Sequence, residues 1–219
     1  MPESDTKAAL PDRIAVFPLA GVLLLPGGRL PLNIFEERYL EMTRAAMATT
    51  RLIGMVQPED PTERAFEPAL YKIGCAGRIT SFDETEDGRF EIVLTGHSRF
   101  RIVAELERET RYRQVTADWQ RFGHDLEPED EAGVDRERLL PALHAYLTLN
   151  SIEVDWGVIE KAPASVLVNQ LAMICPFAPS EKQALLESID LTERSRVMTA
   201  LVEMALLARQ GGGPADVSH

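Results

Sequence analysis

The sequence predicts an α+β fold in which a β-rich part is followed by an all-helical part. Apolar and polar residues alternate with a period of two through much of residues 13–122, as half-buried strands require. Beyond residue 135 the apolar residues recur at intervals of three and four, which is typical of helices. Six acidic residues lie between these parts, in residues 123–135, and predict a linker.

The first elements are short. Residues 1–12 are polar and contain Pro2 and Pro11, so we expect a flexible leader. Three apolar runs follow, IAVFPL, GVLLLP and RLPLNI, and the Pro and Gly residues between them predict short strands joined by tight turns. The run FEERYLEMTRAAMATTR has charges between apolar residues at helical spacing, so it predicts the one helix of this part, and RLIGMVQ predicts another strand.

The next segments predict an antiparallel arrangement. YKIGCAGRITSF and RFEIVLTG flank Glu86, Asp87 and Gly88, and an Asp-Gly pair favours the positive φ angles of a type I′ hairpin turn. SRFRIVAELE and YRQVTADW alternate in the same way. We therefore expect four strands here, with the short segment Gly96-His97-Ser98 ending one of them.

Four helices are expected in residues 136–210. Ser180 and Asp190 are each followed three residues later by Gln or Glu, a capping-box spacing that predicts a helix start at both positions. Glycines and a proline from residue 211 onward cannot continue a helix, so residues 211–219 predict a disordered tail. The apolar faces of three of the helices are Leu139, Leu143 and Leu147; Leu167, Leu171 and Ile174 after Pro163; and Val197, Leu201 and Met204.

Composition narrows the function classes. The net charge of −12 repels the phosphate backbone, so a nucleic-acid partner is not expected. Cys75 and Cys175 lie in apolar stretches and predict buried free thiols, and the N-terminus has no signal-peptide pattern. The apolar runs are also shorter than the ~20 residues that cross a bilayer. These features favour a soluble, cytoplasmic protein that does not enter membranes.

Signatures of catalysis and of cofactor binding are absent from the sequence. No glycine-rich loop with the lysine needed to hold nucleotide phosphates occurs. Gly96-His97-Ser98 begins like a nucleophile elbow, but Arg99 follows where that motif continues toward a second glycine. The histidines, at positions 97, 124, 144 and 219, show no zinc-binding spacing with each other or with the cysteines. We expect no enzyme activity, no cofactor and no metal.

Apolar surface is the remaining candidate for function. Leu23, Leu24 and Leu25 place apolar side chains on both faces of one short strand, which is either a core strand covered on both sides or one that presents a leucine to a partner. Pro26 and Pro31 lack N–H donors, which suits a sheet edge where an extended peptide can add. The candidate binding residues are Leu24, Leu25, Pro26, Pro31, Phe35 and Tyr39.

Three segments, in order, resemble the Lon protease N-terminal (substrate-binding) domain family. IAVFPLAGVLLLPGGRLPLNIFEERY resembles its opening signature, and LYKIGCAGRI and LTGHSRFRI resemble its later strands. LAMICPFAPSEKQALLESIDLTERSRVMTALVEMA resembles its helical half. The matching positions are Phe17, Pro18, Leu19, Pro26, Gly27, Pro31, Leu32, Tyr39, Gly96, Arg99, Arg101, Pro176, Lys182, Gln183, Leu185, Leu186, Glu187 and Arg194, within residues 13–208.

This resemblance implies a β lobe of the PUA-like pseudobarrel type with one inserted helix, followed by a helical lobe. It implies a stand-alone Lon N-terminal-like protein that recognises proteins without cutting them, because no ATPase or peptidase segment follows in these 219 residues. The expected function is non-enzymatic binding of unfolded or apolar polypeptide segments, or of a protease or chaperone partner. The resemblance transfers no binding residues.

PUA-like barrels in other families bind RNA, which leaves a small-ligand or RNA-binding regulatory protein as the alternative. That alternative requires a basic stripe on adjacent strands. Arginines at positions 99, 101, 111 and 113 form one if no carboxylates intervene. The other arrangement is cross-strand ion pairing with glutamates at positions 105, 107 and 109.

Overall fold

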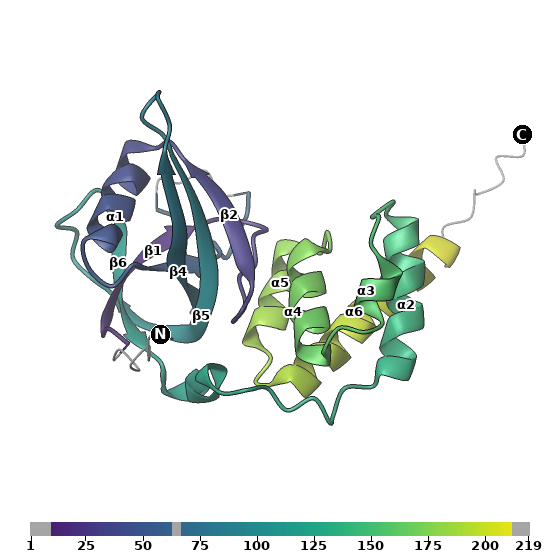
Figure 1. Ribbon diagram of the computed structural model, residues 1–219. Helices are drawn as coiled ribbons and strands as arrows, with labels where there is room; N and C mark the ends of the chain where they lie inside the picture. The colour runs from purple at the N-terminus through teal and green to yellow at the C-terminus, as the bar shows by residue number, and fades with distance from the viewer. Residues whose placement is uncertain (1–9, 63–66, 212–219) are drawn as a thin grey trace, which may run out of the picture. The chain divides into compact units, whose positions relative to one another are not determined.

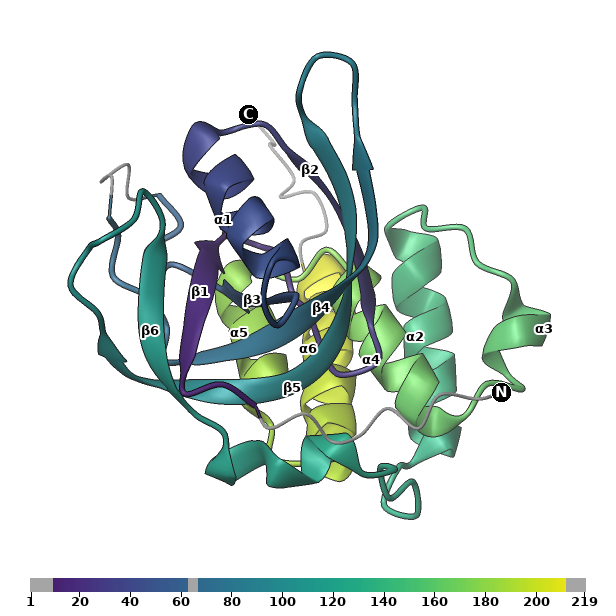
Figure 2. The same ribbon diagram turned by 60° about the vertical axis from the view of Figure 1, so that its left-hand side comes forward.

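The computed structural model describes residues 10–62 and 67–211, and its chain divides after Leu126 into two compact units (Figure 1 and Figure 2). We call them the β unit and the helical unit. The mixture of sheet and helices confirms the predicted α+β class. The predicted leader and tail, residues 1–12 and 211–219, fall almost entirely outside the described residues.

Five strands of the β unit form a closed circuit. In this circuit β1 pairs in parallel with β3, and the antiparallel pairs β3–β4, β4–β5, β5–β6 and β6–β1 complete the ring. The sixth strand, β2, pairs outside the ring with the first half of β5. The strands are β1 (Arg13–Pro18), β2 (Arg29–Ile34), β3 (Leu52–Val56), β4 (Ile73–Glu84), β5 (Phe90–Glu105) and β6 (Arg113–Asp118).

The core of the β unit lies inside this circuit, where Val16, Phe100 and Val115 are buried. Helix α1 (Glu37–Met47) packs beside β1 and β3. Its Tyr39 ring lies 4.1 Å from the ring of Phe17, centroid to centroid. The unit ends in a short 3₁₀ segment, η1 (Gln120–Leu126). Because β4 and β5 are long, their hairpin projects from the ring (Figure 2).

The segment GVLLLP forms no strand, so the prediction of one there is wrong. The two glycines that follow it turn and dock on β5: the N–H of Gly27 donates to the Gly96 carbonyl (2.9 Å), and the N–H of Gly96 donates to the Gly28 carbonyl (2.8 Å). A Cβ on Gly96 would lie 1.9 Å from the carbonyl oxygen of Leu25, so only glycine permits this approach.

Strand β5 is continuous, so the predicted strand end at Gly96 is also wrong. Ala76 of β4 pairs with Ser98 while Gly77 pairs with Gly96, and the extra residue, His97, is accommodated by this bulge. The hairpin turn is not type I′ either. Gly88 has a φ of +79°, whereas Asp87 is not among the described non-glycine residues with positive φ. The chain therefore uses a glycine bulge to reverse.

The helical unit contains α2 (Arg136–Leu149), α3 (Trp156–Ile159), α4 (Ala164–Ile174), α5 (Pro179–Glu187) and α6 (Leu191–Gly211). Helix α6 packs against α2, α4 and α5, and α3 was not predicted. The N–H of Glu193 donates to the carboxylate of Asp190 (2.8 Å), which confirms the predicted cap. The predicted start at Ser180 is wrong, because Pro179 fits the first turn and Ala178 precedes it as N-cap.

The buried face of α6 differs from the predicted one. Met204 is exposed, whereas Met198 and Val202 are buried. Arg194 is also buried, and its Nη1 donates to Glu129 (2.9 Å) and to Asn169 (2.8 Å). An apolar periodicity could not reveal this face, since a hydrogen-bonded arginine lies on it.

Two carboxylates from the segment predicted as a linker are bonded to the helical unit. Glu129 accepts the bond from Arg194 described above. Glu131 accepts hydrogen bonds from the backbone N–H groups of Ala164 (2.9 Å) and Ser165 (3.0 Å) and from the Ser165 hydroxyl (2.6 Å). These bonds place an anion at the N-terminus of α4, where free N–H groups favour negative charge. Hydrogen bonding from the Ser165 side chain, followed by the backbone bonds, lowers the pKa of Glu131.

Candidate functional site

The six candidate binding residues from the sequence analysis differ in their exposure to solvent. Leu24 and Leu25 are both buried, so the expectation that one of them faces a partner is wrong; the alternative of a covered core strand is right about their burial but not about the strand. The Leu24 side chain packs closely over Gly77 of β4, so a Cβ added at Gly77 would lie only 2.8 Å from it. Pro26 is half-buried in the docked turn. The candidates that remain at the surface are Pro31 and Phe35.

Pro31 lies on β2, the end strand of the sheet. Gly96 donates to Gly28 beside the Arg29–Thr95 pair, and bonded and unbonded pairs alternate along an antiparallel ladder. Leu30, Leu32 and Ile34 are therefore the residues whose backbone groups face β5. Arg29, Pro31 and Asn33 direct theirs to the outer edge, so the missing N–H of Pro31 costs the sheet no ladder bond.

A shallow hollow of about 450 Å³ lies over the sheet face beside this edge. Two cross-strand rows line it. Pro31 pairs with Val93 and Val93 with Ser81, so the first row is uncharged and mostly apolar. The second row, Asn33, Glu91 and Asp83, carries two carboxylates. We call this feature the β2 edge; it combines open backbone groups with an apolar row and an acidic row.

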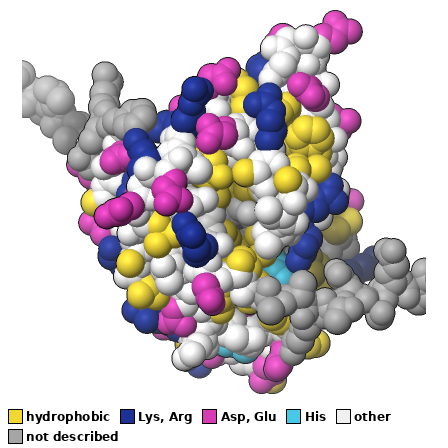
Figure 3. All heavy atoms as spheres, turned by 90° about the vertical axis from the view of Figure 1, so that its left-hand side faces the viewer, with side chains coloured by type: hydrophobic (Ala, Val, Ile, Leu, Met, Phe, Trp, Pro, Cys, Tyr) yellow, Lys and Arg dark blue, Asp and Glu magenta, His cyan; other side chains and the backbone are white. Residues whose placement is uncertain are grey.

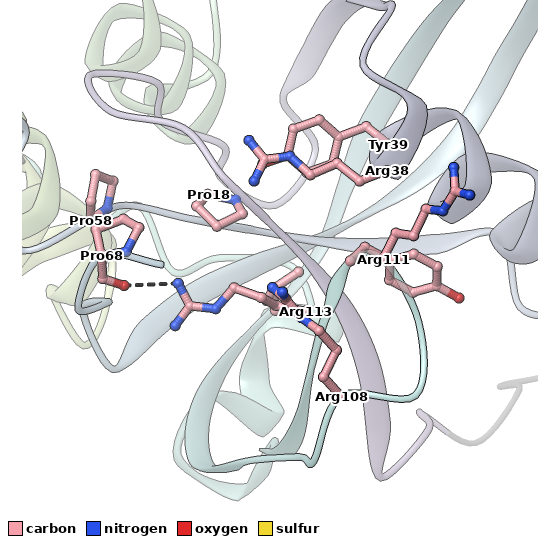
Figure 4. A pocket seen from close by; sticks show the side chains of 10 residues that line it. Pro18, Arg38, Tyr39, Pro58, Pro68, Arg108, Arg111 and Arg113 are labelled. Carbon is pink, nitrogen blue, oxygen red and sulfur yellow. Dashed lines mark hydrogen bonds between the residues drawn. The ribbon is translucent and has the colours of Figure 1, made fainter. Parts of the chain in front are cut away.

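Tyr39 lines a second hollow, of about 150 Å³; of the ten described residues that line it, four are arginines and none is acidic (Figure 4). We call it the arginine pocket. Figure 4 shows Arg38 and Tyr39 on one side of Pro18, and Arg108 and Arg113 on the other. Burial raises the pKa of Tyr39. The lining residues are Val16, Pro18, Arg38, Tyr39, Pro58, Pro68, Arg108, Arg111, Tyr112 and Arg113.

Carboxylates outside the lining hold the four guanidinium groups. Arg113 donates twice to Glu105 (both 2.6 Å) and once to the carbonyl of Pro68 (2.8 Å). The Arg113 hydrogen bond is the main cause that lowers the pKa of Glu105. The other ion pairs are Arg38 with Glu36 (2.8 Å), Arg108 with Glu67, and Arg111 with Glu41 at 3.7 Å.

Sequence reasoning missed this pocket because its arginines come from distant positions. Arg38 lies in the first turn of α1, whereas Arg108 and Arg111 lie between β5 and β6. The signal in the sequence was the cluster of three arginines in ERETRYR, residues 107–113.

The arginines do not form the basic stripe that the RNA-binding alternative requires. Arg99 is buried against Asp125 (2.7 Å), and Arg101 pairs with Asp118 (2.8 Å). Figure 3 shows positive and negative side chains interleaved over the face that it presents. Carboxylates therefore intervene, but of the cross-strand pairs expected with Glu105, Glu107 and Glu109 the structure shows Arg113 with Glu105, whereas Arg111 pairs with Glu41.

The cysteines, the possible metal ligands and the apolarity of the helices bear on the other expectations from the sequence. Cys75 and Cys175 are buried thiols that form no disulfide, as predicted. Within residues 10–62 and 67–211, no group of His, Cys, Asp and Glu could hold a metal ion. No helix in this described part of the chain combines the length and apolarity of a membrane span.

Comparison with known proteins gives consistent matches. The family model described as the ATP-dependent protease La (LON) substrate-binding domain matches residues 13–203. Lon protease of Dictyoglomus thermophilum is 25% identical over 202 residues and Lon protease 2 of Myxococcus xanthus 27% over 213, which are 87% and 90% of this chain. The chain spans only 24% of the length of each.

Two solved structures share the fold. The Lon N-terminal domain protein from Xanthomonas campestris is 25% identical, with a TM-score of 0.59, and the match covers 90% of this chain and 97% of that one. The N-terminal domain of Mycobacterium avium complex Lon protease is 20% identical, with a TM-score of 0.61 and coverages of 87% and 98%.

Proposed function

This chain belongs to the substrate-binding domain family of ATP-dependent Lon proteases, and from that premise we propose that it binds unfolded or apolar polypeptide segments without catalysing a reaction. The observation that carries the proposal is the β2 edge, where an open strand borders a hollow. A polypeptide delivered to a separate protease or chaperone is the expected cargo. The closed strand circuit supports a PUA-like β unit, and two buried free thiols fit a reducing cytoplasm.

Strand addition at β2 is the binding mode that the geometry favours. An extended segment that adds beside β2 meets the N–H groups of Arg29 and Asn33 and the carbonyls of Arg29, Pro31 and Asn33. Its side chains on one face alternate over the hollow, where the apolar row accepts small apolar groups. Glu91 and Asp83 attract basic side chains, in accord with the net charge of −12.

A pair of substitutions at one position tests this mode. Asn33→Pro removes an outward N–H, whereas Asn33→Ala removes the same side chain and keeps the N–H. One backbone hydrogen bond contributes about 1 kcal/mol, so we expect Asn33→Pro to weaken binding of fluorescein-labelled apocytochrome c, a basic unfolded polypeptide, about fivefold.

Fluorescence anisotropy measures the affinities, and circular dichroism checks that both variants keep the sheet. Asn33→Ala should bind within twofold of the parent protein. Equal binding by the parent and a folded Asn33→Pro variant would exclude strand addition at this position.

A further inference from the structure

We propose that the arginine pocket binds a carboxylate group of a polypeptide. This pocket is separate from the β2 edge. The proposal rests on the proposed function in one respect, that a polypeptide supplies the carboxylate. Among the described residues, four arginines and no acidic residue line the pocket, in a chain whose net charge is −12. Guanidinium groups offer forked N–H pairs that match the two oxygens of a carboxylate.

The pocket is organised before a ligand arrives. Arg113 is held by Glu105 and by the Pro68 carbonyl, and its side chain is only 11% exposed. Within residues 10–62 and 67–211 these bonds use three of its five N–H groups, and the other two can donate to a ligand. The guanidinium of Arg38 lies over the Tyr39 ring, 4.5 Å from its centroid. Fixing these side chains in advance lowers the entropic cost of binding.

The walls are apolar as well as basic. Val16, Pro58 and Tyr112 are buried in the protein and line the hollow beside the arginines. A partly dry wall strengthens an ion pair with the ligand, because water competes less for the charges. A carboxylate attached to a short apolar group therefore fits the lining.

The charge balance favours a carboxylate over a phosphate. Glu36, Glu41, Glu67 and Glu105 each pair with one of the four arginines from outside the lining. These four carboxylates balance the formal charge of the four arginines, so the pocket attracts a ligand through its N–H donors rather than through an excess of charge and suits a monoanion better than a doubly charged phosphate. Arg111 is the most loosely held of the four, with its ion pair at 3.7 Å and its side chain 69% exposed, and it can turn toward an incoming group.

The test follows the arginine Nε–H signals of ¹⁵N-labelled protein by NMR during titration with three short peptides. They are acetyl-Ala-Ala-Leu with a free C-terminal carboxylate, the same peptide as a C-terminal amide, and acetyl-Ala-Asp-Leu amide. We expect the free carboxylate to shift the signals of Arg38 and Arg113 saturably, and the first amide to leave them unchanged. The Asp peptide shows whether a side-chain carboxylate also binds.

Variants locate the site. Arg113→Gln and Arg111→Gln should each weaken binding of the carboxylate peptide at least tenfold. Arg89→Gln, which makes the same charge change at the exposed hairpin tip where Arg89 pairs with Asp87, should stay within twofold. Arg111→Gln keeps the test valid if Arg113→Gln fails to fold, since the Arg111 side chain is 69% exposed and its ion pair with Glu41 is long.

Three results would overturn the proposal: equal binding of the carboxylate and the first amide peptide, an equal loss in Arg89→Gln, or saturable shifts with inorganic phosphate while neither carboxylate peptide binds. The outcome is distinguishable from failure of strand addition. Suppose that no carboxylate peptide binds but that Asn33→Pro still weakens apocytochrome c binding. This result would refute carboxylate binding in the arginine pocket and leave strand addition at the β2 edge standing.

Discussion

Removing the charge of Asp125 should destabilise the β unit strongly, because Asp125 is the partner of a fully buried arginine. The side chains of Arg99 and Asp125 are 0% and 3% exposed. Asp125 accepts bonds from Arg99 Nη2 (2.7 Å), from Nε (3.0 Å) and from the backbone N–H of Arg99 (2.7 Å). The guanidinium also lies 4.2 Å from the centroid of the Phe122 ring. This cluster attaches η1 to β5.

The expected loss in the free energy of unfolding follows from the burial of both side chains. Asp125→Asn leaves a buried guanidinium without its counter-charge, and breaking a buried pair in this way costs about 3–5 kcal/mol. Replacing both partners, as Arg99→Met with Asp125→Leu, removes the uncompensated charge but leaves the Arg99 backbone N–H without its acceptor, a cost of about 1–3 kcal/mol. The double variant should therefore be more stable than Asp125→Asn.

Urea denaturation followed by circular dichroism measures these differences. Arg101→Gln is the matched control on the same strand, because the Arg101–Asp118 pair is 49% and 22% exposed. Its loss should cost no more than ~1 kcal/mol. A cost below ~1 kcal/mol for Asp125→Asn, or equal costs for the buried and exposed pairs, would refute the reasoning from burial.

Four further results are expected from the structure. Leu25→Asp should destabilise the β unit by about 3 kcal/mol or more, because it buries an unpaired charge, and unchanged urea stability would contradict this. Gly96→Ala should cost about 2 kcal/mol in the same assay, since its Cβ meets the Leu25 carbonyl. Because the folded pKa of Glu131 is lowered, its stabilising contribution is present above the unfolded value near 4.5 and is lost as pH falls through the folded value. The urea midpoints of the parent and Glu131→Gln should thus differ at pH 7 and converge near pH 3, whereas a gap independent of pH would exclude the Ser165 bonds as its cause. Burial raises the pKa of Cys175 to about 12, so iodoacetamide at pH 8 should modify Cys175 only in denaturant, as read by mass spectrometry.

Most elements could be predicted from the sequence because their signals are local. The alternation around Ile92 and the four-residue spacing of Leu139 and Leu143 reflect one buried face each, and both patterns match the observed strand and helix. The failures involve contacts between distant residues. Leucines 24 and 25 form no strand because the turn after them docks on Gly96, a contact that no local pattern reports.

The candidate sites show the same limit. Pro31 could be placed at a sheet edge because a missing N–H is a local property of the residue. The exposure of Leu25 could not be predicted, since it depends on what packs against it. Arg99 was visible as part of a family motif, but its partner Asp125 lies on a different element, so its structural role emerged only from the fold.

Hydrogen exchange at the β2 edge tests the central claim most directly. Backbone amides of the ¹⁵N-labelled protein are followed by NMR with and without a saturating amount of apocytochrome c. Strand addition predicts slower exchange of the outward N–H groups of Arg29 and Asn33. Leu30 and Leu32, whose N–H groups already face β5, should change little. Binding of apocytochrome c without protection of Arg29 and Asn33 would contradict polypeptide recognition by strand addition at this edge.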